Sequence, residues 1–84
     1  VQPRTSLRMR PNPTNGDVSI AWQGDPLKRA RLYVYDPAGR TVRSFEWPDN
    51  DSEIQLRLED LPPGLYYVKV VAGGRLVAVE KLVK

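Results

Sequence analysis

The 84-residue sequence contains no cysteine and no histidine, and it has one methionine and one phenylalanine. Without cysteine the chain forms no disulfide and offers no thiolate to a metal, and without histidine it cannot assemble a histidine-based catalytic triad. A chain this short makes one domain with a modest core, because it buries only about 60% of the surface of its unfolded form. Packing and rigid turns therefore have to replace the disulfides that small extracellular domains often use.

Long apolar runs are also missing. No stretch approaches the length of about 20 residues that crosses a bilayer, and no secretory signal peptide is recognisable. The chain starts at Val1 and its methionine is Met9, so we expect an excised or processed piece of a longer protein. The net charge is +3, from 13 basic and 10 acidic residues that are interleaved. Nucleic-acid-binding proteins usually gather their basic residues more densely, so this pattern predicts solvated strand faces and no nucleic-acid partner.

Groups that could catalyse a reaction are scarce. The serine and threonine hydroxyls have no histidine base, and the carboxylate pairs Asp49/Asp51 and Glu59/Asp60 lie in expected loops. Glycosidases use such pairs across a cleft, for which a domain of this size has little room. We therefore predict a non-catalytic domain without a cofactor. The loop Asp49 to Asp51 has oxygen ligands that suit calcium, but its spacing matches no EF-hand and such loops are usually plain turns.

Alternating apolar and polar residues indicate short β-strands. The clearest case is Asp17–Gln23, in which Val18, Ile20 and Trp22 share one face, the pattern of a half-buried strand. Because seven such segments are separated by turns and none has a helical period, the sequence predicts an all-β, seven-stranded antiparallel β-sandwich. The expected strands are Ser6–Arg10, Asp17–Gln23, Ala30–Tyr35, Arg40–Glu46, Glu53–Leu58, Leu65–Val71 and Arg75–Val83.

Three of these strands carry additional information. Arg40–Glu46 alternates poorly, with Val42 and Phe45 on opposite faces, which predicts an edge strand or a bulge. Leu65–Val71 is the most apolar segment, so we expect it at the centre of its sheet. In the last strand, simple alternation predicts one face with Val77, Val79 and Val83 and the other with Leu76 and Leu82.

A rigid corner joins the first two expected strands. It consists of Pro11-Asn12-Pro13-Thr14-Asn15-Gly16. Each proline fixes its own φ and pushes the preceding residue toward extended geometry, whereas Asn-Gly supplies turn conformations. We expect the chain to run stiffly through Asn12 and to fold sharply at Asn15-Gly16. Residues 1–6 precede this unit as the end of a linker, and residues 7–84 form the domain.

Two further turns have residue patterns that predict a particular local structure. In Asp36-Pro37-Ala38-Gly39, proline suits the second position of a type I turn and Gly39 suits a left-handed closing residue, which predicts a hairpin. In Leu61-Pro62-Pro63-Gly64, a leucine and a proline-glycine turn lead to Tyr66 at the start of a strand. This arrangement predicts a tyrosine corner, in which Tyr66 buries its ring and returns its hydroxyl to a nearby backbone group.

The ordered set of motifs resembles the C-terminal sorting domain of the type IX secretion system. The motifs are Pro11 to Gly16, Tyr35-Asp36-Pro37-Ala38-Gly39-Arg40, Leu61-Pro62-Pro63-Gly64-Leu65-Tyr66-Tyr67-Val68 and Glu80-Lys81-Leu82-Val83-Lys84. The resemblance runs from Leu7 to Lys84. It implies an immunoglobulin-like sandwich of seven strands, in agreement with the pattern of the residues.

The resemblance also implies a function. Such domains lie at the C-terminus of secreted cargo, fold in the periplasm, and are recognised by the outer-membrane translocon and its shuttle components. A surface signal peptidase typically removes them, here by cleavage in or before residues 1–6 or outside this sequence, and the cargo stays at the cell surface or is secreted. Glycine and proline mainly shape turns, so Arg40 and the tail are the better contact candidates. The motif residues implied in recognition are Pro11, Asn12, Pro13, Asn15, Gly16, Gly39, Arg40, Gly64, Tyr66, Lys81, Leu82, Val83 and Lys84.

An alternative is a fibronectin-III-like accessory module of a secreted enzyme, placed on a polysaccharide by an aromatic platform. Trp22 fits the core better than a platform. Tyr33 and Tyr35 lie on the Arg31 face, and they would make a platform if they line up with Tyr67 across strands. Trp47 is a further aromatic candidate, and the accessory module remains the alternative to the sorting function that the resemblance implies.

The lysines of the last strand also allow two roles. Lys81 and Lys84 either protect an edge strand from aggregation or provide recognition charges. The resemblance favours recognition. Unpaired edges would also allow self-association of the domain through its edge strands.

Overall fold

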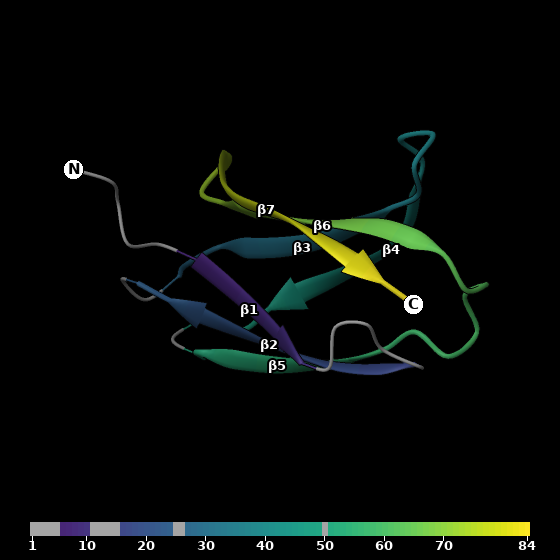
Figure 1. The fold of residues 1–84 in the computed structure, drawn as a ribbon. Helices are drawn as coiled ribbons and strands as arrows, with labels where there is room; N and C mark the ends of the chain where they lie inside the picture. The colour runs from purple at the N-terminus through teal and green to yellow at the C-terminus, as the bar shows by residue number, and fades with distance from the viewer. Residues whose placement is uncertain (1–5, 11–15, 25–26, 50) are drawn as a thin grey trace.

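The computed structural model describes residues 6–10, 16–24, 27–49 and 51–84, and these residues form seven antiparallel strands in two facing sheets (Figure 1). The predicted all-β, immunoglobulin-like sandwich is confirmed. This described part contains no helix of the length and apolarity that a membrane span requires. The strands are β1 (Ser6–Arg10), β2 (Asp17–Gln23), β3 (Ala30–Tyr35), β4 (Thr41–Trp47), β5 (Glu53–Arg57), β6 (Leu65–Ala72) and β7 (Arg75–Val83).

One sheet has three strands in the order β1-β2-β5, and the other has four in the order β4-β3-β6-β7. Strand β4 is therefore an edge strand, as its poor alternation predicted, and β6 lies between two neighbours, as its apolar sequence predicted. Strand ends differ from the prediction by one residue at several places. In particular, β5 ends at Arg57 and β6 continues to Ala72.

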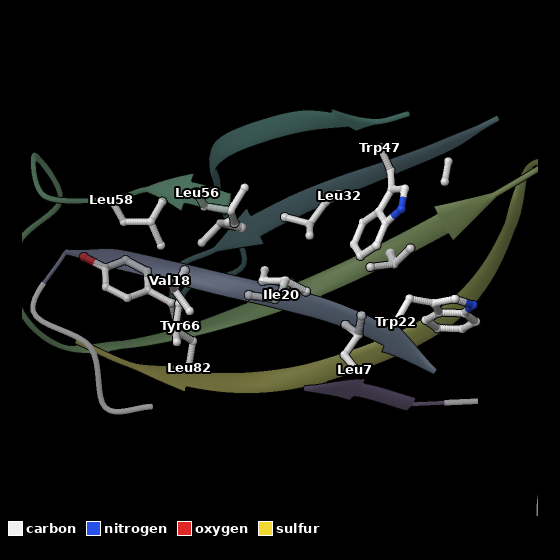
Figure 2. Packing of buried hydrophobic residues seen from close by; sticks show 14 of the residues in the cluster. Leu7, Val18, Ile20, Trp22, Leu32, Trp47, Leu56, Leu58, Tyr66 and Leu82 are labelled. Carbon is white, nitrogen blue, oxygen red and sulfur yellow. The ribbon is translucent and has the colours of Figure 1, made fainter. Parts of the chain in front are cut away.

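The core lies between the sheets and is built from the alternate residues of each strand (Figure 2). Val18, Ile20 and Trp22 of β2 are buried, as predicted, and they face Leu32 and its neighbours from the opposite sheet. Burying one such aliphatic side chain contributes about 1.5–3 kcal/mol. The fully buried side chains of largest volume are Trp47, Ile20, Leu32, Leu56, Leu58, Leu82, Val18, Val34, Val68 and Val70.

Trp47 is the main correction to the predicted core. The expected strand stopped at Glu46, and Trp47 was a candidate for an exposed aromatic platform. The strand includes Trp47, which pairs with Ala30 and is only 1% exposed. Its indole Nε1 donates a hydrogen bond to the carbonyl oxygen of Asp51 at 2.6 Å, so the one polar atom of the ring is satisfied. Trp47 is therefore a core residue.

Both edge strands of the larger sheet contain a bulge. The register of β4 shifts beside Val34 and Tyr35, which leaves Val42 as the extra residue. The register of β7 shifts beside Val70 and Val71, which leaves Val77 as the extra residue. The predicted bulge in β4 is confirmed. Bulges concentrate at sheet edges because an edge strand has hydrogen-bond partners on one side only.

The bulge in β7 overturns the predicted faces of that strand. Leu76 was expected to share a face with Leu82. Since Val77 adds one residue to β7, Leu76 instead lies on the face that carries Val79 and Val83, which is directed away from the core. Leu82 remains in the core and is 0% exposed.

Candidate functional site

The strand register brings the sequence motifs to one end of the sandwich. Tyr35 at the end of β3 lies opposite Tyr67 near the start of β6, and Tyr67 lies opposite Lys81 near the end of β7. In Figure 1 the β3–β4 hairpin, the connection from β5 to β6 and the C-terminus all lie at the right-hand end. Motifs that are far apart in the sequence are therefore neighbours in space.

The C-terminal residue is bound to the proline-glycine turn. Gly64 and Lys84 exchange two backbone hydrogen bonds, of 3.0 and 2.8 Å, which extend the pairing of β6 with β7. The ammonium group of Lys84 donates a hydrogen bond to the carbonyl oxygen of Leu61 at 2.5 Å and lies 3.4 Å from that of Glu59. The terminal motif and the turn thus form one structural unit.

Tyr66 fixes the same turn from the inside. The residue is only 6% exposed, and its hydroxyl donates a hydrogen bond to the carbonyl oxygen of Pro62 at 2.5 Å. Figure 2 shows the ring near Val18, with its hydroxyl directed away from the centre of the core. The predicted tyrosine corner is confirmed, and it holds the residues before Gly64 against the sandwich.

Gly16 connects the N-terminal corner to this unit. Its carbonyl oxygen accepts a hydrogen bond from the backbone N–H of Leu58 at 2.7 Å. A Cβ atom at this position would lie 3.0 Å from the Cβ and 3.3 Å from the Cα of Glu59, and the φ of +152° also disfavours other residues. Any larger residue would therefore crowd Glu59 and strain the backbone. The other predicted corner residues, Pro11, Asn12, Pro13 and Asn15, lie outside the described residues.

The β3–β4 hairpin is organised by Asp36. The backbone N–H of Gly39 donates to the carbonyl oxygen of Asp36 at 2.9 Å, and the φ of Gly39 is +88°, as the turn chemistry predicted. The Asp36 carboxylate accepts hydrogen bonds from the backbone N–H groups of Ala38, at 3.0 Å, and Arg40, at 2.9 Å. The backbone N–H of Arg40, together with its side chain, lowers the pKa of the Asp36 carboxyl group.

Arg40 is displayed by this hairpin. Its Nε donates to a carboxylate oxygen of Asp36 at 2.9 Å, while 80% of its side chain remains exposed. The ion pair orients the guanidinium group without removing it from solvent. Arg40 is therefore a positioned surface cation at the end of the sandwich.

The four terminal candidates divide between surface and interior. Lys81 and Val83 are exposed, and they lie opposite Tyr67 and Leu65 on the outward face of β6 and β7. Leu82 has no exposed surface and contributes to the core. Lys84 is half-buried against the proline-glycine turn. Its ammonium group therefore stabilises the turn and is still partly exposed to solvent.

The tyrosines share an outward face. The rings of Tyr33 and Tyr35 are stacked with centroids 6.3 Å apart and planes inclined by 16°. Lys69 Nζ lies 4.7 Å from the centroid of Tyr35, and the lysine lowers the pKa of the Tyr35 hydroxyl. Because Tyr35 lies opposite Tyr67, the alignment that the platform hypothesis required is present for this pair.

The loop from Asp49 to Asp51 supplies hydrogen-bond acceptors to neighbouring parts of the fold. The Oδ1 atom of Asp49 accepts a hydrogen bond from the backbone N–H of Arg29 at 3.1 Å, and Arg29 has a φ of +53°. The carbonyl oxygen of Asp51 is the acceptor for the indole of Trp47. In the described residues there is no group of three or more histidine, cysteine or acidic side chains arranged to hold a metal ion.

Two long-range contacts at this end gave no signal in the sequence. One is the approach of Gly16 to Glu59. The other is the ion pair between Arg43 of β4 and Asp60, which joins an edge strand to the connection between the sheets. Asp60 appeared in the sequence only as half of a carboxylate pair. Neither contact has a local pattern, because each joins residues that only the folded sandwich brings together.

A comparison with known families agrees with this arrangement of motifs. The sequence model of the family described as "Secretion system C-terminal sorting domain" matches residues 8–84. The match extends over both sheets and includes Gly16, the β3–β4 hairpin, the proline-glycine turn and the terminal lysine.

Proposed function

The chain belongs to the family of type IX secretion system C-terminal sorting domains, and from this premise we propose that the translocon recognises it as a folded domain. A sorting domain of this kind directs export to the cell surface or the medium. The proposed recognition surface is the end of the sandwich at which the motifs meet. Arg40, Lys81 and Val83 supply exposed groups there, and Gly16, Gly39, Gly64 and Tyr66 hold the turns in place.

The observation that supports folded recognition is the bond between Lys84 and Leu61. These residues are 23 positions apart, and their contact depends on the pairing of β6 with β7. The surface made by the turn and the tail therefore exists only in the folded domain. An extended peptide would present the same residues without this geometry.

We further propose the route that the family resemblance implied. The domain folds in the periplasm, meets the translocon and its shuttle components, and is removed by a surface signal peptidase near residues 1–6. Strand β1 begins at Ser6, so cleavage before it would leave every strand of the sandwich intact. The domain acts by binding, with no catalytic step and no cofactor of its own.

A secretion assay tests this function. The chain would be fused behind a signal peptide and a fluorescent protein in a host with a type IX system, and in a translocon mutant of that host. We expect reporter in the medium or at the surface of the first host and in the periplasm of the second. Periplasmic reporter in both hosts, with a folded domain, would contradict the proposal.

Point substitutions test recognition better than truncation. Deleting Glu80 to Lys84 also removes Leu82 from the core, so loss of export would not distinguish lost recognition from unfolding. Arg40→Ala and Lys81→Ala change exposed side chains instead. We expect each to reduce export while the domain keeps its thermal midpoint.

A second function is favoured by one observation, the alignment of Tyr35 with Tyr67. Aromatic rings on a sheet face can stack on sugar rings, so an accessory module that binds polysaccharide is the alternative. Affinity electrophoresis in gels that contain polysaccharide would test it. Retardation that is lost on Tyr67→Ala would support this role, and equal mobility in every polysaccharide would contradict it.

A further inference from the structure

The exposed apolar side chains gather on one surface. Among the described residues, the large apolar side chains that remain exposed are Tyr67 at 37%, Leu76 at 60%, Val79 at 49% and Val83 at 38%. All four come from β6 and β7, the last two strands of the larger sheet. We call the outward side of these two strands the outer β6–β7 face.

The register shows that these side chains share a face. Val83 lies opposite Leu65, Lys81 opposite Tyr67, and Val79 opposite Lys69, while the intervening residues Tyr66, Val68 and Val70 point into the core. Beyond the bulge, Leu76 lies opposite Val71 and so joins the same row. The outer β6–β7 face is thus a continuous stripe along the length of both strands.

Such a stripe is unusual for a solvated surface. Single exposed apolar residues are common, but a contiguous row on a small domain usually marks an interaction surface. The outward residues of the smaller sheet provide the contrast, since Arg8, Arg10, Gln23, Glu53 and Gln55 are polar or charged there. The bulge at Val77 is also informative, because without it Leu76 would point inward.

The charges on the stripe limit what can cover it. Its outward positions include Lys69 and Lys81 and no carboxylate, whereas Glu80, the acidic residue of β7, alternates to the opposite side. Two copies of the domain joined through this face would therefore bring lysines together. A partner that places carboxylates beside an apolar surface would complement both the lysines and the stripe.

We propose that the outer β6–β7 face docks a protein component of the secretion system that presents apolar side chains bordered by carboxylates. The inference rests on the proposed sorting function. It extends the recognition surface from the motif-bearing end, where Lys81 and Val83 lie, along β7 to Val79 and Leu76. Neither Val79 nor Leu76 belongs to a motif that the sequence singled out.

The test uses the reporter fusion with three sets of variants. Leu76→Glu with Val79→Glu places carboxylates in the stripe, and Lys69→Glu reverses one of its charges. Gln23→Glu with Gln55→Glu is the matched control, because it adds the same charge at outward positions of the smaller sheet. We expect the stripe double variant to lower export by at least about tenfold, Lys69→Glu by severalfold, and the control by little.

The outcomes separate this inference from the sorting function. Export of the unchanged domain together with equal export of folded stripe variants would overturn the inference and leave sorting intact. Failure of the unchanged domain to be exported would overturn the sorting function and this partner with it. The thermal midpoint of each variant shows whether it folds. If the stripe double variant does not fold, the export of Lys69→Glu alone tests the inference.

Two other occupants are examined with the purified chain. A dimer in sedimentation velocity that dissociates in the stripe double variant would assign the face to a second copy. Binding to vesicles of anionic phospholipid that is lost in the same variant would assign the face to a membrane. Either result would overturn the proposal. We expect a monomer that does not bind such vesicles.

Discussion

The ammonium group of Lys84 lies 2.5 Å from the carbonyl oxygen of Leu61, so the last side chain of the chain closes a turn 23 positions earlier. This contact ties the terminal motif to the proline-glycine motif. It also means that a change in the tail alters the shape of the turn. Substitutions at this end can therefore test the stability of the fold separately from the proposed recognition.

Lys84→Met keeps the aliphatic stem and removes the hydrogen-bond donor. Because a carbonyl oxygen then loses a charged partner at a half-buried site, we expect a loss of about 1 kcal/mol in the free energy of unfolding. Urea denaturation of the purified domain measures this loss. Lys81→Met is the control, since Lys81 is exposed, and an equal loss there would contradict the specific role of Lys84.

Tyr66→Phe tests the tyrosine corner. The substitution keeps the buried ring and removes the hydroxyl that donates to Pro62. We expect destabilisation of about 0.5–1.5 kcal/mol, because a hydrogen bond is lost at a partly buried position. Tyr67→Phe in the exposed neighbour should change the free energy of unfolding little. Equal effects of the two substitutions in chemical denaturation would show that the corner does not stabilise the fold.

Gly16→Ala and Gly39→Ala compare two glycines with positive φ. Both substitutions strain the backbone, because alanine disfavours positive φ. At Gly39 an added Cβ atom would meet open space, whereas at Gly16 it would lie 3.0 Å from the Cβ atom of Glu59. We expect Gly16→Ala to destabilise by a further about 1–3 kcal/mol because the site becomes overpacked. Thermal and urea unfolding of both variants measure the difference. A smaller effect at Gly16 would contradict the close approach.

Trp47→Ala tests the assignment of Trp47 to the core. Removal of a fully buried aromatic side chain should cost about 3–5 kcal/mol, enough to unfold much of a small domain. Trp47→Phe should cost less, since it keeps most of the apolar volume but leaves the Asp51 carbonyl oxygen without its indole donor. Circular dichroism during unfolding would check both variants. An unchanged free energy of unfolding in Trp47→Ala would contradict the assignment of Trp47 to the core.

The environment of Asp36 makes the stability of the domain depend on pH in the acid range. Its pKa is lowered in the folded domain by the backbone N–H and side chain of Arg40, so the folded state favours the charged carboxylate. This stabilisation is complete above the unfolded pKa of about 3.9 and is lost as the pH falls through the lower folded value. Thermal midpoints of the unchanged domain and of Asp36→Asn should therefore differ at pH 7 and converge below about pH 4. A constant difference across this range would contradict the assignment.

The sequence by itself determined the strands, the core faces of most of them and the sharp turns. Alternation placed Val18, Ile20 and Trp22 in the core, because side chains of a strand point alternately to its two faces. Turn chemistry placed Gly39 in a left-handed conformation and Tyr66 in its corner, since few other residues suit those positions. These are local properties that the order of residues carries directly.

The tertiary structure alone decided which residue of each edge strand is the extra one and which distant residues meet. An edge strand has a partner on one side only, so it can accept an extra residue at Val42 or Val77. The bulge at Val77 turned Leu76 outward and completed the apolar stripe, against the simple alternation. The contacts of Gly16 with Glu59 and of Lys84 with Leu61 depend on the packing of whole strands. No local pattern encodes such contacts, because the energy that forms them comes from burial across the two sheets.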